Sequence, residues 1–431
     1  MQKNLTIVRY LIVIVAVLAI AGLLGWYFFL KTQTDTTNLS EQGRGLDSSA
    51  PSFTGSTGST YENITQSTVT DTSVGTSSVQ TTNAPPVLWR VSQTPTAGMG
   101  FVVDTSGLKL NFVERASGNV FSANTVTGKV ERLTNTLLPK IYLAAFTKDG
   151  AVALRSIGQN GATTLFAGTV PQKAPPATAE IASSSPVTLK GTYLAENVRG
   201  MAVNPKAHEL FYILPDAKIG AIGIRSAWDG TGQKRVFESG ILGWRPQWLA
   251  DGRIILTQNP AYDLAGSAYT LDTTGTLTPL VRNIPGLTLL ARASSKTLVY
   301  GTATNNTLVL YVQKDKKDPE VLPVKTVADK CVWSPKNDMV IYCAVPQSLG
   351  VGNFLDSWLQ GRIHTSDTWW QVNLANDTAE IIFVSENSSA NSLDVIQPTI
   401  DDSGRYVSFL NGADMSLWVL TIPDASSTPS Q

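Results

Sequence analysis

Few residue types in this chain can do chemistry, because it holds only two cysteines and two histidines among 431 residues. The cysteines, Cys331 and Cys343, flank the turn-like stretch 334–338, and each lies six residues from Asn337. In an antiparallel hairpin they would face each other with Cα atoms about 4.5–5.5 Å apart, within disulfide range. We therefore expect a Cys331–Cys343 disulfide, the alternative being two reduced, buried thiols. Their spacing matches no zinc or redox motif.

A second group of interest lies in the long segment 346–367, between two predicted strands. It contains Phe354, Trp358, His364 and Asp367. An inserted loop with several aromatic residues favours a recognition surface, since large aromatic side chains contribute strongly to binding. We predict that these four residues contact a ligand. The alternative is that Trp358 is an ordinary core residue.

No catalytic arrangement stands out. The sequence has no G-x-S-x-G elbow, no G-x-x-x-x-G-K-[ST] phosphate loop and no H-E-x-x-H motif. The stretch 226–231 resembles the aspartate box of sialidase-type propellers only in part, and a hairpin turn is the simpler interpretation. His208 lies in a turn-like stretch, where we expect it to be solvated. We therefore expect no enzymatic activity, no metal site and no cofactor.

The elements that must position these residues are short strands. From Val87 onward, apolar segments alternate with tight polar turns, and a second hairpin turn follows in several units. Seven turns mark the units: 104–107, 148–150, 205–208, 250–252, 294–296, 335–338 and 401–404. Most follow one another at intervals of about 42–57 residues, and two hairpins in that length give four strands, one blade of a β-propeller.

Three of these turns point to a known family. The segments AFTKDG (145–150), WSPKND (333–338) and TIDDSG (399–404) resemble the aromatic-S-P-D-G turn of TolB-like, WD-repeat-like bacterial propellers. The resemblance covers 87–422 and implies a binding platform, without naming a ligand.

Seven turns predict an all-β, seven-bladed propeller over residues 87–422. The last unit has only three evident strands, 394–400, 405–410 and 415–422, whereas one unpaired strand, 87–91, precedes the first unit. We predict that this early strand becomes the outer strand of the last blade. Closing the ring in this way removes the open sheet edge.

The insertion can be assigned to one face of such a ring. In a propeller, the loops between the second and third strands lie on the same face as the connections between blades, and that face usually holds ligands. We expect 356–360 to form a short helical turn there. Tyr262 and Asp263, from the corresponding loop of the fourth unit, share this face and are further predicted binding residues.

The N-terminal residues 1–31 predict a membrane anchor. The run 11–30 is apolar and uncharged, and twenty helical residues span about 30 Å, the thickness of a bilayer core. Lys3 and Arg9 precede it, which predicts a cytoplasmic N-terminus and a propeller outside the membrane. The alternative is a cleaved signal peptide with a small-x-small site at 19–21. We predict that the anchor is retained.

Residues 32–86 are rich in serine and threonine and predict a disordered tether, as 423–431 predict a disordered tail. The chain has 33 basic and 33 acidic residues, so no net positive charge favours nucleic acid. We therefore expect a single-pass protein of the cell membrane whose propeller binds a protein or glycan of the cell envelope. The alternative function is a glycan-cleaving hydrolase that uses the same face and needs paired carboxylates about 5–10 Å apart.

Overall fold

The chain divides into two compact units, Met1–Thr82 and Asn83–Gln431. The computed structural model describes residues 85–423, except 105–106, 159, 171–185, 294, 305–306, 316, 351 and 385–391. The predicted anchor, all but the last two residues of the tether, and residues 424–431 lie outside the described residues. Among the residues that are described, no helix is long and apolar enough to cross a membrane.

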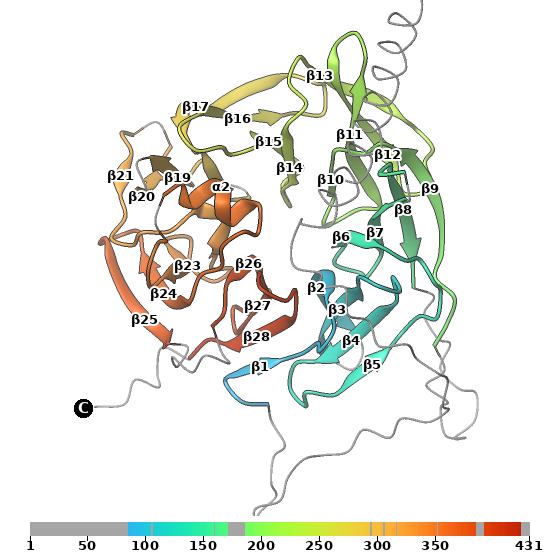
Figure 1. Cartoon of the computed structure of the whole chain (residues 1–431), viewed down its shortest axis with the longest axis horizontal. Coiled ribbons are helices and arrows are strands. Elements are labelled where there is room, and N and C mark those ends of the chain that lie inside the picture. Colours follow the sequence, from blue (N-terminus) through green and yellow to red (C-terminus); the bar gives the residue numbers. More distant parts are fainter. Residues whose placement is uncertain are drawn as a thin grey trace, which may run out of the picture. The chain divides into compact units, whose positions relative to one another are not determined.

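The predicted seven-bladed propeller is confirmed: seven four-stranded antiparallel sheets follow one another around a ring (Figure 1). From inner to outer strand, blades 1 to 4 are β2 (Thr96–Asp104), β3 (Gly107–Glu114), β4 (Val120–Asn124), β5 (Val130–Arg132); β6 (Ile141–Phe146), β7 (Val152–Ile157), β8 (Thr163–Thr169), β9 (Lys190–Glu196); β10 (Gly200–Val203), β11 (Glu209–Asp216), β12 (Gly220–Ala227), β13 (Lys234–Ser239); and β14 (Trp244–Trp248), β15 (Ile254–Gln258), β16 (Ala265–Leu271), β17 (Leu277–Pro285). Blades 5 to 7 are β18 (Thr288–Ala291), β19 (Leu298–Thr304), β20 (Thr307–Gln313), β21 (Glu320–Val321); β22 (Cys331–Trp333), β23 (Val340–Pro346), β24 (Asp367–Asn373), β25 (Thr378–Val384); and β26 (Val395–Ile400), β27 (Tyr406–Asn411), β28 (Leu417–Thr421), β1 (Leu88–Arg90).

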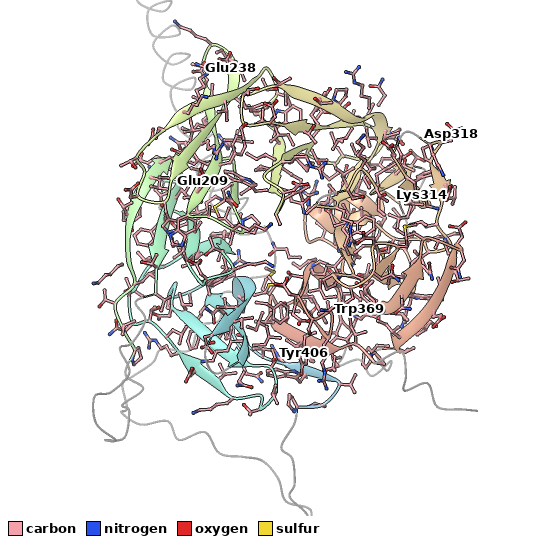
Figure 2. The ribbon with its side chains drawn as sticks, turned by 180° about the vertical axis from the view of Figure 1, so that it is seen from behind. Glu209, Glu238, Lys314, Asp318, Trp369 and Tyr406 are labelled. Atoms are coloured by element: carbon pink, nitrogen blue, oxygen red, sulfur yellow. A yellow bond between two sulfur atoms is a disulfide. The ribbon has the colours of Figure 1, made fainter. Side chains whose placement is uncertain are left out.

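The second strand of each blade is an apolar run, because neighbouring blades cover both of its faces. All six residues of β27 are buried, and in β11 the run 210–213 is at most 1% exposed. Aromatic side chains fill the space between blades, as Trp369 of blade 6 does against Phe409 of blade 7, with ring centroids 5.6 Å apart (Figure 2). Trp248, predicted to pack between blades, lies in an apolar cluster formed by blades 3 and 4.

The predicted closure of the ring is confirmed. β1 pairs antiparallel with β28, with Trp89 opposite Val419, so the last blade takes its outer strand from the start of the described chain. Trp89 is 9% exposed and Val91 8%, and both belong to the core. The closing strand therefore contributes apolar burial as well as backbone hydrogen bonds.

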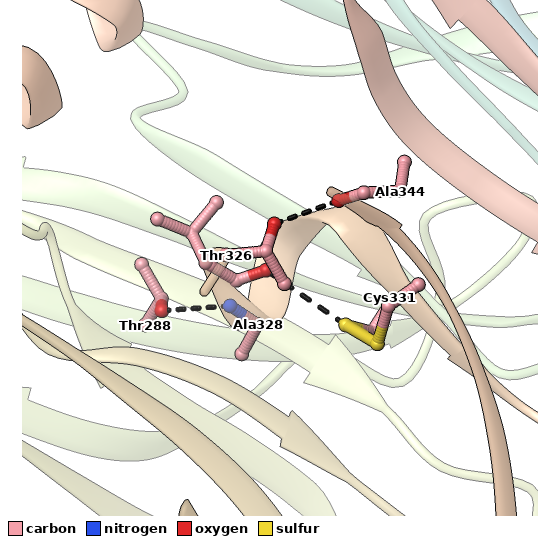
Figure 3. Close-up of a disulfide and its surroundings, with 7 residues drawn as sticks. Thr288, Thr326, Ala328, Cys331 and Ala344 are labelled. Atoms are coloured by element: carbon pink, nitrogen blue, oxygen red, sulfur yellow. Dashed lines mark hydrogen bonds between the residues drawn. A yellow bond between two sulfur atoms is a disulfide. The ribbon is translucent and has the colours of Figure 1, made fainter. Parts of the chain in front are cut away.

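The predicted disulfide is also confirmed. Cys331 and Cys343 are direct partners in the β22–β23 ladder, with Cα atoms 4.1 Å apart, and they form a disulfide (Figure 3). Nearby, the Thr326 hydroxyl donates to the carbonyl of Ala344, and the Ala328 N–H donates to the Thr288 hydroxyl. The segment that enters blade 6 is thereby fixed to both blade 5 and blade 6.

Two faces of the ring follow from the antiparallel pairing. One face carries the turns between the first and second strands and between the third and fourth strands of each blade; we call it the turn face. The other carries the loops between the second and third strands and the connections between blades. The helices α2 (Phe354–Leu359) and η1 (Ala328–Lys330) lie on this second face, which we call the α2 face. Figure 1 shows α2 beside blades 5 and 6.

Candidate functional site

The helix α2 forms within the predicted insertion, between β23 and β24. Asn353 caps its N-terminus, because the Asn353 Oδ1 accepts the backbone N–H of Asp356 at 3.1 Å. Phe354 and Trp358 lie one helical turn apart, and their rings stack with centroids 6.3 Å apart. The helix ends before Gly361, whose φ of 68° suits a residue without a side chain.

The apolar side of α2 faces the propeller. Phe354 is 2% exposed, Leu355 is fully buried and Trp358 is 6% exposed. They belong to one apolar cluster with Ala303 and Leu308, which come from blade 5. The helix is therefore docked on the ring and does not stand free in solvent.

Beneath α2 lies a buried group of charged and polar side chains, which we call the Lys330 cluster. Its members are Lys330, Trp358, His364, Thr365, Asp367 and Asp394. The Lys330 ammonium donates to Asp367 Oδ2 at 2.5 Å, to Asp394 Oδ1 at 2.7 Å and to the Thr365 hydroxyl at 2.9 Å. A fourth contact, at 3.0 Å, goes to the carbonyl of Val395. The side chains of Lys330, Asp367 and Asp394 are at most 2% exposed.

Asp394 joins α2 to this cluster. Its Oδ1 accepts the Trp358 indole N–H at 2.8 Å and the Thr365 hydroxyl at 2.8 Å. The Lys330 ammonium also lies 4.8 Å from the centre of the Trp358 ring, in cation–π range. Every polar group of the indole is thus used inside the protein.

One ammonium serves two buried carboxylates, and their pKa values separate as a result. Burial raises the pKa of Asp367 above its usual range, and the attraction of Lys330 only partly offsets it. Burial also acts on Asp394, but Lys330 and hydrogen bonds from Trp358 and Thr365 outweigh it and lower the pKa of that carboxyl. A separation of this kind is a property of many functional sites.

His364 connects the cluster to solvent. Its Nδ1 lies 3.1 Å from Asp394 Oδ2, while the side chain is 36% exposed. A carboxylate that holds one ring nitrogen fixes the orientation of the imidazole and leaves the other nitrogen to face a ligand.

Blade 4 contributes to the same face through the loop after β15. The backbone N–H of Tyr262 donates to Asp356 Oδ1 at 2.8 Å, so this loop is attached directly to α2. Asp263 is exposed and has a φ of 54°. The predicted meeting of the two loops on one face is therefore observed.

The structure thus brings together Phe354, Trp358, His364 and Asp367, with Tyr262 and Asp263 beside them. Their role in binding stays a prediction. Sequence reasoning missed Lys330 and Asp394, which hold the group together. The available signal was that each is a charged residue placed immediately before the apolar inner strand of a blade.

Two sequence interpretations away from this face have also been resolved. Residues 226–231 belong to a hairpin turn between β12 and β13, where the Asp229 carboxylate accepts the N–H of Thr231. His208 is 48% exposed, and its Nε2 lies 2.7 Å from Asp149 Oδ2 of the neighbouring blade. Among the residues of the described ranges, no group of three or more His, Cys, Asp or Glu side chains is arranged to hold a metal ion.

The sequence matches no protein-family profile, and no curated protein matches it. Solved structures are similar in fold. An oligogalacturonate lyase in complex with manganese is 11% identical with a TM-score of 0.50, over 81% of this chain and 96% of its own. Oligogalacturonate lyase from Vibrio parahaemolyticus is 11% identical with a TM-score of 0.49, over 78% and 94%. The β-propeller domain of Cps50 (Swd1) from Myceliophteria thermophila is 8% identical with a TM-score of 0.47, over 78% and 100%.

These identities establish the fold alone. They nevertheless correct the expectation that the chain is not an enzyme. That expectation was drawn from the absence of familiar catalytic motifs and of an attached hydrolase domain. Because an oligogalacturonate lyase has this same architecture, a propeller without those motifs gives no ground for excluding catalysis.

Proposed function

We propose that the protein is a membrane-tethered, TolB-like propeller outside the cytoplasm, and that it binds a protein or glycan of the cell envelope through its α2 face. The apolar run 11–30 and the serine- and threonine-rich tether support the membrane attachment. The attachment is tested by sequencing the N-terminus of the mature protein. A mature terminus at Met1 is expected, and one near Gly22 would show that the run is a cleaved signal.

The observation that carries the binding proposal is the way the insertion is fixed to the ring. Asp394 attaches it to blade 7, Lys330 to the entry of blade 6 and Tyr262 to blade 4. Residues fixed in advance lose little entropy when a ligand binds, so a preorganised surface binds more tightly than a mobile loop.

Exposed and buried members of the insertion have different roles in this proposal. Gln360, Arg362 and His364 are exposed beside α2, and Asp263 is exposed on the adjoining loop. These side chains make the direct contacts. Phe354, Trp358 and Asp367 serve binding by holding them in place.

The test compares the full-length protein with a variant in which Gln360, Arg362 and His364 are all alanine. Partners captured from solubilised cell envelopes are identified, and their affinity for each protein is then measured. We expect at least about a tenfold loss of affinity with unchanged thermal unfolding. The control replaces Lys206, Lys336 and Asn337, on the turn face, by alanine. Equal affinity of both variants would exclude the α2 face as the binding surface.

A second candidate function is cleavage of a glycan on the same face. It is favoured by the His364–Asp394 pair, in which a buried carboxylate orients an exposed imidazole that could act as a general base. Direct attack by the paired carboxylates is not supported, because both side chains are at most 2% exposed. Release of oligosaccharides from envelope glycans, abolished by His364→Ala, would support this function. Intact glycan after incubation with wild-type protein would oppose it.

A further inference from the structure

The turn face holds a cavity that the proposed function does not use. Its volume is about 630 Å³, within the range of small-molecule sites. It lies where the inner strands of blades 7, 1 and 2 end. The lining residues are Met99, Gly100, Phe101, Val103, Leu108, Thr125, Val126, Phe146, Thr147, Lys148, Thr399, Ile400, Asp401, Asp402, Ser403, Arg405 and Tyr406.

The walls of this cavity are largely apolar and only partly covered. Phe101, Leu108 and Phe146 are each half-buried, although they belong to or adjoin the inner strands of the ring. At the rim, Val103 is 69% exposed and Val126 is 60% exposed. Adjoining apolar side chains that folding leaves uncovered are typical of a surface that a ligand covers. Figure 2 shows the labelled Tyr406, which completes the wall from blade 7.

An ion pair crosses the opening. The Lys148 ammonium of blade 2 lies 2.6 Å from Asp402 Oδ2 of blade 7, on the far side of blade 1. The two side chains are 53% and 74% exposed, so solvent screens the pair and it contributes little to stability. A ligand can therefore displace it easily.

The remaining charges of the lining are unequal. Both oxygens of Asp401 accept backbone N–H groups of its own turn, and the residue is 1% exposed. Asp402 is paired with Lys148. Arg405 is exposed beside Tyr406, and among the residues that the structure describes its guanidinium has no carboxylate within ion-pair distance. The uncompensated charge of the cavity is therefore positive.

We propose that this cavity binds an amphipathic anion: a molecule with an apolar body, aromatic or acyl, and one oxyanion such as a carboxylate. The body occupies the wall formed by Phe101, Leu108 and Phe146. The oxyanion pairs with Arg405 and competes with Asp402 for Lys148. This site lies on the turn face and does not depend on the function proposed for the α2 face.

The experiment measures binding of 8-anilinonaphthalene-1-sulfonate, an aromatic anion, to the full-length protein by fluorescence. Val126→Lys and Val126→Glu place opposite charges at one exposed rim position without touching the core. We expect one saturable site, with affinity raised about two- to fivefold by Val126→Lys and lowered by a similar factor by Val126→Glu and by Arg405→Gln. Val321, 59% exposed on the outer strand of blade 5, is the matched control. Val321→Lys and Val321→Glu should leave the affinity unchanged.

Competition then separates the two halves of the proposed ligand. Decanoate should displace the probe, whereas acetate, which has the charge without the body, should not. Displacement by decanol as effective as that by decanoate would overturn the assignment of the anion. Absence of saturable binding, or equal responses at positions 126 and 321, would overturn the site itself.

Discussion

Replacement of Lys330 by methionine tests the buried cluster most directly. Methionine has a similar length and an apolar end, so the space is kept while the charge is removed. Lys330 is fully buried, and its ammonium is the one cation that the structure shows in contact with both Asp367 and Asp394 among the described residues. The variant therefore leaves two carboxylates next to each other in a dry interior.

The expected cost is large because an uncompensated buried charge is worse than none. Removing one partner of a buried ion pair typically costs about 3–5 kcal/mol of unfolding free energy. By contrast, Lys148→Met breaks an ion pair whose side chains are 53% and 74% exposed, and should cost no more than about 1 kcal/mol. Lys148→Met is therefore the matched control.

The pH dependence of the Lys330→Met variant follows from the carboxyl pKa values. Folding already raises the pKa of Asp367, so the folded wild type holds that proton more tightly than the unfolded chain, and this contribution falls as pH rises above about 4. Folding lowers the pKa of Asp394, whose contribution is present above about pH 4 and is lost as pH falls through the lowered value. Without Lys330, both carboxyls should behave as Asp367 does. The loss of stability should thus be greatest at neutral pH and shrink towards about pH 4–5.

Urea unfolding of each full-length protein at pH 5 and pH 7.5, followed by tryptophan fluorescence, measures these differences. A further variant that also carries Asp367→Asn and Asp394→Asn removes every charge and should recover part of the lost stability at pH 7.5. The reasoning is refuted if Lys330→Met costs no more than Lys148→Met, or if its cost is the same at both pH values.

Three other perturbations test the fold. Replacing both Cys331 and Cys343 by alanine should cost about 2–3 kcal/mol at most, since the disulfide closes a short loop, and non-reducing mass spectrometry of the native protein should find the two peptides linked; two free thiols would contradict the bridge. A protein that begins at Thr96 lacks β1 and exposes the edge of β28, so it should aggregate in light scattering; a monomer with unchanged melting would show that closure is dispensable. Gly98→Ala places a Cβ 2.1 Å from the carbonyl oxygen of Ala144 in blade 2 and should cost about 1–3 kcal/mol in urea unfolding. Gly240→Ala, with its nearest neighbour 3.9 Å away, should cost much less, and equal costs would refute the argument from close approach.

Features that depend on neighbouring residues could be predicted from the sequence. The polar turns mark the hairpins, and two hairpins per interval give four strands and hence the blade count. The symmetric placement of Cys331 and Cys343 about Asn337 gives their pairing, because register in a hairpin follows from the position of the turn. The missing strand of the last unit predicts that 87–91 closes the ring, since an unpaired edge is unfavourable.

The Lys330 cluster and the cavity on the turn face were decided only by the tertiary structure. Lys330 and Asp394 are 64 residues apart, and they meet because consecutive inner strands of the ring begin side by side. The sequence marks Trp358 as an aromatic residue in an insertion, but the direction of its side chain depends on where Asp394 presents an acceptor. Lys148 and Asp402 are 254 residues apart, and ring closure brings them together. Local pattern governs backbone pairing between adjacent segments, whereas contacts across a closed ring depend on the position of every blade between them.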